Sequence, residues 1–445
     1  MSRRSEHRRP DRHAEAVLEA RLGRPARDIL EATVVLEAWT GRTASRAMSS
    51  ARELVRSDTP PIRALSSVEP PGDGDQTSVV AEGITLVLLI VSIAAWATPI
   101  RRHLGPDVLS HAIRVALPIA VGLQWGLRSR YLGRPQGIAC LARDRPIIWV
   151  AILTLVEVPL LLLGAWGVIA AMLVPIWVGS AILIRRGWGL TYAGLLVVAT
   201  VVTTEDVSDP ELMLGVLTAI TLLMCVVAIR TRVGSRTGLR AGSISRALVA
   251  ALIGGVLGVL LVADPSLGWG VHGSYPALAL VPSVIGSYWG GYYLWNFYEA
   301  VPRGLRGVSL RGAGGLALSD PAMAIFIGAV ARLVVATAVL SAVAFVIGEA
   351  FGGTDSVSLF VAFGCVGVVS MLVGMLEAFS LQTAALLAVM AALAAELAWA
   401  GLVGHHAAGG ALAVGATLGV LLALPILLAR VARSGRVLAT TLWIQ

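Results

Sequence analysis

The feature that most constrains this chain is a series of long apolar segments between about Val79 and Ala429, separated by short polar breaks. An apolar segment of ~20 residues is long enough to cross the ~30 Å hydrocarbon layer of a bilayer as a helix. A helix also satisfies its own backbone hydrogen bonds, which lipid cannot do. Only 14% of the 445 residues are charged, against roughly 25% in typical soluble proteins. The sequence therefore predicts an all-α, polytopic integral membrane protein.

The apolar segments predict about twelve transmembrane helices. We place them at residues 79–99, 107–126, 146–165, 167–184, 188–203, 212–229, 244–263, 275–298, 321–348, 357–377, 382–402 and 410–429. The second of these is interrupted by Arg114. An even number favours two six-helix bundles divided at the basic 230–243 loop, by analogy with transporters that are built from repeats.

The polar breaks alternate in charge, and this alternation predicts the orientation. One set is rich in Arg and includes the breaks at 127–145, 185–187, 230–243 and 299–320 and the C-terminal tail. The other set has no Arg at 204–211, 264–274, 349–356 and 403–409; only 100–106, with Arg101 and Arg102, departs from the pattern. Short cytoplasmic loops carry the positive charge in membrane proteins. We therefore expect a multi-pass protein of the bacterial inner (plasma) membrane, with both termini in the cytoplasm.

The region before the first span has a different composition. Residues 1–12 form a basic tail that we expect to be disordered, and residues 57–78 are a Pro- and Gly-rich linker. Between them, residues 13–56 show helical spacing and predict a small cytosolic helical module, with Ile29 and Leu36 among its candidate buried residues. The transmembrane domain is predicted over 79–430, followed by a cytosolic tail at 431–445. The module is a candidate docking site for a cytosolic protein partner.

The composition excludes several classes of function. All 35 basic residues are Arg and none is Lys, so the Lys-containing phosphate loop of P-loop ATPases is excluded. The basic charge lies in short loops and the tail, which indicates contact with the lipid bilayer and no nucleic-acid partner. Cys140, Cys225 and Cys365 are far apart and are expected to be free thiols. We find no catalytic motif and expect no enzyme activity, cofactor or metal.

Charged residues inside apolar spans are the first candidate site residues, because they tend to face a cavity or a partner. Glu157 lies near the middle of the third predicted span, two residues before Pro159, and Arg332 lies mid-span in the ninth. Glu396 lies deep in an Ala-rich span. These three are predicted to bind substrate or a coupling ion. The alternative is a static ion pair between helices that only fixes their packing.

An aromatic cluster at the end of the eighth predicted span is the second candidate site. Seven of the residues from Ser287 to Glu299 are aromatic, and the predicted site comprises Tyr288, Trp289, Tyr292, Tyr293, Trp295, Asn296 and Tyr298. The cluster is typical of an interfacial aromatic belt. It also suits a stacking platform for a sugar or aromatic ligand at the cytoplasmic mouth, with Arg303 and Arg306 placed to contact a phosphate or a lipid headgroup.

These features together favour a membrane transporter, or a flippase for lipids or lipid-linked saccharides, that works by alternating access. The alternative is a non-transporting membrane scaffold or receptor subunit. Such a subunit would dock a cytosolic machine through residues 13–56, or support an envelope polysaccharide synthase.

Overall fold

The computed structural model of the chain describes most of the apolar segments and the core of the N-terminal region. The described residues are 12–22, 26, 29–40, 44–55, 87–88, 102–103, 105–129, 146–185, 187–204, 209–231, 244–267, 279–280, 283, 319–350, 357–379, 381–403 and 409–432. Almost all of the predicted tails, the 57–78 linker and the predicted spans at 79–99 and 275–298 lie outside these residues.

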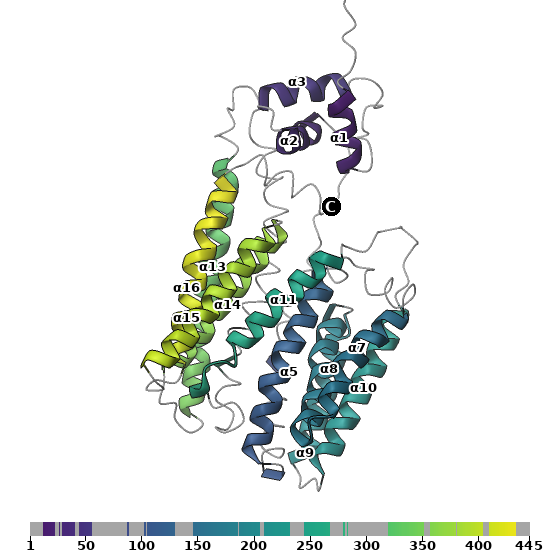
Figure 1. Cartoon of the computed structure of the whole chain (residues 1–445), viewed down its shortest axis with the longest axis vertical. Coiled ribbons are helices and arrows are strands. Elements are labelled where there is room, and N and C mark those ends of the chain that lie inside the picture. Colours follow the sequence, from purple (N-terminus) through teal and green to yellow (C-terminus); the bar gives the residue numbers. More distant parts are fainter. Residues whose placement is uncertain are drawn as a thin grey trace, which may run out of the picture. The chain divides into compact units, whose positions relative to one another are not determined.

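Every regular element in the described part of the chain is helical (Figure 1). The elements are α1 (Arg12–Leu22), α2 (Ile29–Thr40), α3 (Ala44–Val55), α5 (Pro106–Leu127), α7 (Pro146–Leu161), α8 (Ala165–Arg185), α9 (Gly189–Thr204), α10 (Pro210–Thr231), α11 (Ile244–Leu260), the short 3₁₀ helix η2 (Pro265–Leu267), α13 (Ser319–Ala350), α14 (Val357–Ala378), α15 (Gln382–Val403) and α16 (Gly410–Ala432).

Seven of the described helices are long and apolar enough to cross a bilayer, namely α5, α8, α10, α13, α14, α15 and α16. Shorter apolar helices occur within α9 and at α11. The chain is therefore an all-α, polytopic membrane protein, as the sequence predicts. Ten of the predicted spans each contain one described helix. The largest difference is at α7, which ends at Leu161 because the chain turns through Gly164 (φ 79°) into α8.

The chain divides into two compact units, and each is considered by itself. The first comprises residues 1–73, 293–332 and 425–445. Its best-described part is the N-terminal group of α1, α2 and α3, in which α2 packs against both neighbours. Their core is apolar and small, with Leu36 fully buried beside Ala32, Ala47 and Ala51. Ile29, an expected core residue, is instead 38% exposed at the first residue of α2.

The second unit comprises residues 74–292 and 333–424. Side chains of α5, α7, α8, α9 and α10 form one continuous apolar core in it. Polar groups inside this core bond between helices: Gln124 Nε2 donates to the Trp177 carbonyl (2.8 Å), and the Tyr192 hydroxyl lies 2.9 Å from Thr221 Oγ1. Such bonds satisfy groups that lipid would leave unpaired.

The closest helix contact in this unit joins α5 and α11, which run side by side (Figure 1). Small residues make the approach possible, as the Gly254–Gly255 and Gly258 pattern predicts. A Cβ added at Gly254 would lie 2.7 Å from the Trp125 Cβ, and one at Gly258 would lie 2.5 Å from the Pro118 Cα. At Gly258 the two backbones are therefore nearly in contact, and at Gly254 the Trp125 side chain packs directly against the α11 backbone.

Three contacts in the second unit test the alternation of helix directions. Arg128, after α5, lies beside Glu377 at the end of α14. The Gln382 amide at the start of α15 donates to the Arg246 carbonyl at the start of α11 (3.5 Å). The Gly409 N–H, before α16, donates to Ser266 Oγ after α11 (3.1 Å). Each contact joins two ends that the loop charges place on the same side, so these helices alternate as predicted.

Candidate functional site

A buried acidic turn follows α11. This helix has 17 residues and so rises about 25 Å, less than the ~30 Å hydrocarbon layer. The chain then turns through Asp264, whose side chain is 1% exposed. Asp264 Oδ1 accepts hydrogen bonds from the Ser266 N–H (2.9 Å) and the Ser266 hydroxyl (2.5 Å). Asp264 Oδ2 is buried and has no hydrogen-bond partner among the described residues.

Ser266 also ties this turn to the beginning of α16. Its Oγ accepts the Gly409 N–H at 3.1 Å. Gly409 has φ 76°, and a Cβ there would lie 3.0 Å from the Leu359 Cα. Both the positive φ and this close approach require glycine. The acidic turn is thus held against the first turns of α14 and α16, near the positive N-terminal end of the α16 dipole.

Glu396 on α15 reaches the same region from about two turns before Val403. Its side chain is 0% exposed. The Asp264 carboxylate is the charged group that interacts electrostatically with Glu396. The Asp264 backbone N–H also points towards the Glu396 carboxylate. Both carboxylate oxygens of Glu396 are buried, and neither has a hydrogen bond of ordinary geometry to another described residue. The structure therefore gives Glu396 an acidic neighbour, which the sequence did not predict.

The surroundings of Glu396 are closely packed. A Cβ added at Gly415 on α16 would lie 2.6 Å from the Ala392 carbonyl oxygen and 2.9 Å from the Glu396 Cβ. One helical turn on, a Cβ at Gly419 would lie 3.3 Å from the Ala392 Cβ. The backbone of α16 therefore lies directly against α15 beside the carboxylate, and glycine at position 415 is needed for that approach.

Two adjacent buried carboxylates destabilise a fold if both are ionised. Burial costs several kcal/mol per ion after relaxation. Two unit charges ~4 Å apart repel by about 4 kcal/mol at an effective dielectric constant of ~20. Among the described residues no cationic side chain contacts Asp264 or Glu396, and the Ser266 bonds and the α16 dipole compensate only part of the charge. The pair is therefore stable only when it takes up positive charge.

A second charged group lies at the opposite end of α14, and it differs in having a partner. The Glu377 carboxylate lies beside the Arg128 guanidinium and bonds to the Ser129 hydroxyl. Arg128 Cζ is 5.5 Å from the centroid of the Trp125 ring. A Cβ at Gly374 would lie 3.4 Å from an Arg128 nitrogen, so glycine leaves room for the guanidinium. Glu377 thus has a cationic neighbour, at the point where the ends of α5 and α14 meet.

Glu157 and Arg332, the predicted charged pair, are placed differently from each other. Glu157 is half-buried on α7, and its buried Oε1 has no hydrogen-bond partner in the described part of the chain. Arg332 is exposed on α13. The two residues belong to different compact units, so their pairing stays a prediction.

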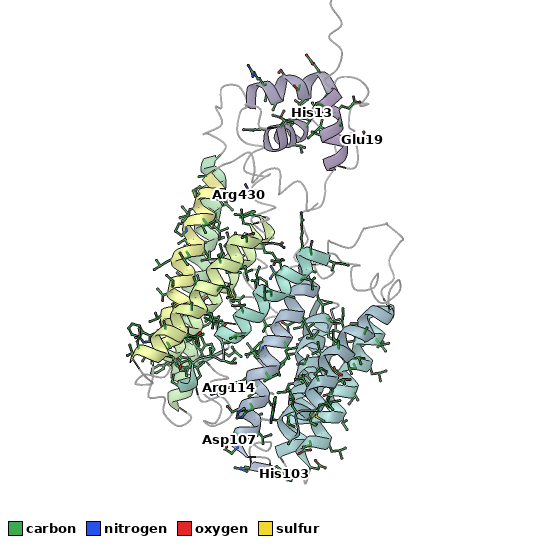
Figure 2. All side chains as sticks on the ribbon, viewed as in Figure 1. His13, Glu19, His103, Asp107, Arg114 and Arg430 are labelled. Atoms are coloured by element: carbon green, nitrogen blue, oxygen red, sulfur yellow. The ribbon has the colours of Figure 1, made fainter. Side chains whose placement is uncertain are left out.

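Arg114, which interrupts the second predicted span, lies on α5. Figure 2 shows it on the same half of this helix as Asp107, towards the first residues of α5. Its side chain is half-buried, and its Nε is buried without a hydrogen-bond partner among the described residues. The Arg114 side chain therefore does not interrupt α5, which continues as a helix through this position.

The aromatic cluster at 288–298, together with Arg303 and Arg306, lies outside the described residues, so its proposed role stays a prediction. Cys225 and Cys365 are free thiols, and Cys140 is also outside the described part. Within the described residues no group of three or more His, Cys, Asp or Glu side chains is arranged to hold a metal ion.

Asp264 is the site residue that the sequence analysis missed. In the sequence it belongs to the Arg-free break at 264–274. The signal that points to it is local: Asp264 directly follows the apolar segment of α11 and precedes Pro265 and Ser266, a pattern typical of a side chain that bonds to the next turn. Its nearness to Glu396 has no sequence signal, because the two residues are far apart in the chain.

Comparison with known proteins leaves the family open. No family model matches the chain, and no curated protein matches it. The fold is similar to that of a solved structure of MATE in complex with MaL6, with 11% sequence identity and a TM-score of 0.42 over 80% of this chain and 97% of that one. We therefore infer the function from the buried acidic pair and the helices that hold it.

Proposed function

We propose that this protein is a membrane transporter, or a flippase for lipids or lipid-linked saccharides, that works by alternating access. The observation that carries the proposal is the buried pair of Asp264 and Glu396, which has no cationic partner among the described residues. A scaffold gains nothing from such a pair, since apolar side chains of similar volume would stabilise it more. In membrane proteins, ionisable groups buried at this cost mark ion and substrate pathways.

In the proposed cycle, the helices around the acidic pair expose it alternately to the two sides of the membrane. Glu157 and Arg332 are the charged residues that we assign to the substrate path. The aromatic cluster from Tyr288 to Tyr298 forms the cytoplasmic mouth, where aromatic rings stack on a sugar or lipid group. Arg303 and Arg306 follow it in sequence and bind phosphate through paired N–H donors. The protein acts in the inner membrane and is not an enzyme.

The test is transport by the purified full chain in liposomes, with lipid-linked saccharides and fluorescent amphiphiles as the screened substrates. The proposal expects saturable flux that is lost in Glu396→Gln and reduced in Glu157→Gln and Arg332→Gln. Glu377→Gln is the matched control, because that carboxylate lies on a neighbouring helix but has a cationic partner. Flux that is equal in wild type and in Glu396→Gln removes the acidic pair from the mechanism.

A second function is favoured by the N-terminal helices. The α1–α3 group has an apolar core of its own, as a module that docks a partner requires. In this alternative the membrane part is a scaffold or receptor, and residues 13–56 bind a cytosolic machine. Deletion of residues 1–76 distinguishes the two: full liposome flux by the truncated chain supports transport, whereas loss of cellular function with no flux in either form supports docking.

A further inference from the structure

We propose that Asp264 and Glu396 together bind one exchangeable proton, and that this proton is the coupling ion of the transport cycle. The second part rests on the proposed function, whereas the first stands on the structure alone. The carboxylates approach each other from elements far apart in the sequence, the turn after α11 and the middle of α15. Glu396 is fully buried, and neither of its oxygens has a hydrogen bond of ordinary geometry to another described residue.

The two carboxylates are held unequally, which decides how the proton is shared. Asp264 Oδ1 accepts hydrogen bonds from the Ser266 N–H and hydroxyl. Glu396 has no such donor from a side chain. We therefore assign the proton to Glu396, whose carboxylate oxygens are both buried beside the Asp264 turn. The pair then carries one negative charge in place of two.

The packing favours a proton over a larger ligand. The backbone of Gly415 packs closely against the Glu396 side chain. A Cβ added at position 415 would lie only 2.9 Å from the Glu396 Cβ. Leu359 is equally close to Gly409. A bulky solute does not fit between these backbones, whereas a proton needs no volume.

Other titratable groups on the helices around the pair lie away from it. In the described parts of α11, α14 and α16 these groups are Arg246, Cys365, Glu377 and Arg430. Arg246, Glu377 and Arg430 lie at the far ends of their helices from Asp264, and Cys365 lies near the middle of α14. Within the described parts of these helices, the acidic pair therefore accounts for the titratable groups at this site. In each cycle one proton enters it from one compartment and leaves to the other, without another bond being made or broken.

The first experiment is infrared difference spectroscopy of the full chain in lipid nanodiscs, titrated with pH in sodium and in choline buffers. Wild type should show one protonated carboxyl C=O band that disappears at alkaline pH and is lost in Glu396→Gln. Asp264→Asn should move the midpoint of that band, and Glu377→Gln should leave it unchanged. A band that persists in Glu396→Gln overturns the assignment, as does a titration that requires sodium in place of protons.

Thermal unfolding supplies the second measurement and covers the case of a poorly folded variant. A folded pair that holds a proton becomes less stable as pH rises, because the unfolded chain releases that proton more readily. The melting temperature of wild type should therefore fall towards alkaline pH, and the Glu396→Gln profile should be flatter. An equal slope in both proteins contradicts the proposal. If Glu396→Gln lacks the band but keeps its liposome flux, the coupling role is rejected. If wild type shows the band but no flux, only the proposed transport function is rejected.

Discussion

The contact between α5 and α11 makes a sharp prediction about two glycines on one helix. A Cβ at Gly258 would lie 2.5 Å from the Pro118 Cα and 3.0 Å from the Pro118 nitrogen, which are backbone atoms that cannot rotate away. A Cβ at Gly255 would meet only the Pro118 carbonyl oxygen, at 3.9 Å. Gly258→Ala should therefore force the helices apart and destabilise the protein by about 1–3 kcal/mol. Gly255→Ala should be neutral, or stabilising by up to ~1 kcal/mol, because alanine is the better helix former.

The assay is reversible unfolding of the full chain in mixed micelles, followed by tryptophan fluorescence. Trp125 lies against Gly254 in this contact and is one of the 12 tryptophans of the chain, so the emission follows unfolding of the chain as a whole. Both substitutions add the same methyl group to the same helix, and lipid and propensity effects therefore cancel in the comparison. Equal unfolding free energies for Gly258→Ala and Gly255→Ala would refute the close backbone approach.

Three further predictions concern other parts of the chain. Tyr192→Phe removes the 2.9 Å bond to Thr221 but keeps the ring, so it should destabilise by about 1 kcal/mol, measured by the same unfolding assay; no loss would show that the bond contributes nothing. Burial raises the pKa of Glu37, so its ionised form destabilises the α1–α3 group. Glu37→Gln should slow hydrogen exchange of α2 amides near about pH 7 and have no effect near about pH 4; the opposite pH dependence would contradict the burial of Glu37. Single cysteines introduced at Ser208 and Ser235 in a cysteine-free chain should differ in whole cells, with external maleimide reaching 208 but not 235; the reverse result would overturn the orientation.

The helices were predictable because the physical signal is local. An apolar segment of spanning length must be helical in lipid, and the ends of α14 and α15 follow directly from where polar residues resume. The alternation of Arg-rich and Arg-free breaks predicted which helix ends share a side, and the contact of Gln382 with Arg246 agrees with it. In the N-terminal group Ile29 was an exception, because it is the first residue of α2 and is 38% exposed.

The candidate site was only half predictable. Glu396 stood out as a carboxylate in an Ala-rich segment, since a charge there has a high cost in lipid. Its neighbour Asp264 did not, because a single acidic residue in a loop is ordinary, and only the tertiary packing of α11 against α15 makes it unusual. Partner choice among charged residues depends on helix placement, and no spacing in the sequence encodes it.

The glycine-lined approach of α5 to α11 also limits how this protein can move. At Gly258 the neighbouring atoms are backbone atoms that cannot change rotamer, and sliding by one turn of ~5.4 Å would drive a larger residue into a main chain. We therefore expect α5 and α11 to move together as one rigid body in any conformational change. Asp264 follows α11 and Glu396 is on α15. Separation of the acidic pair would therefore require α15 to move relative to α5 and α11, which couples the charge of the pair to the contact between α11 and α15.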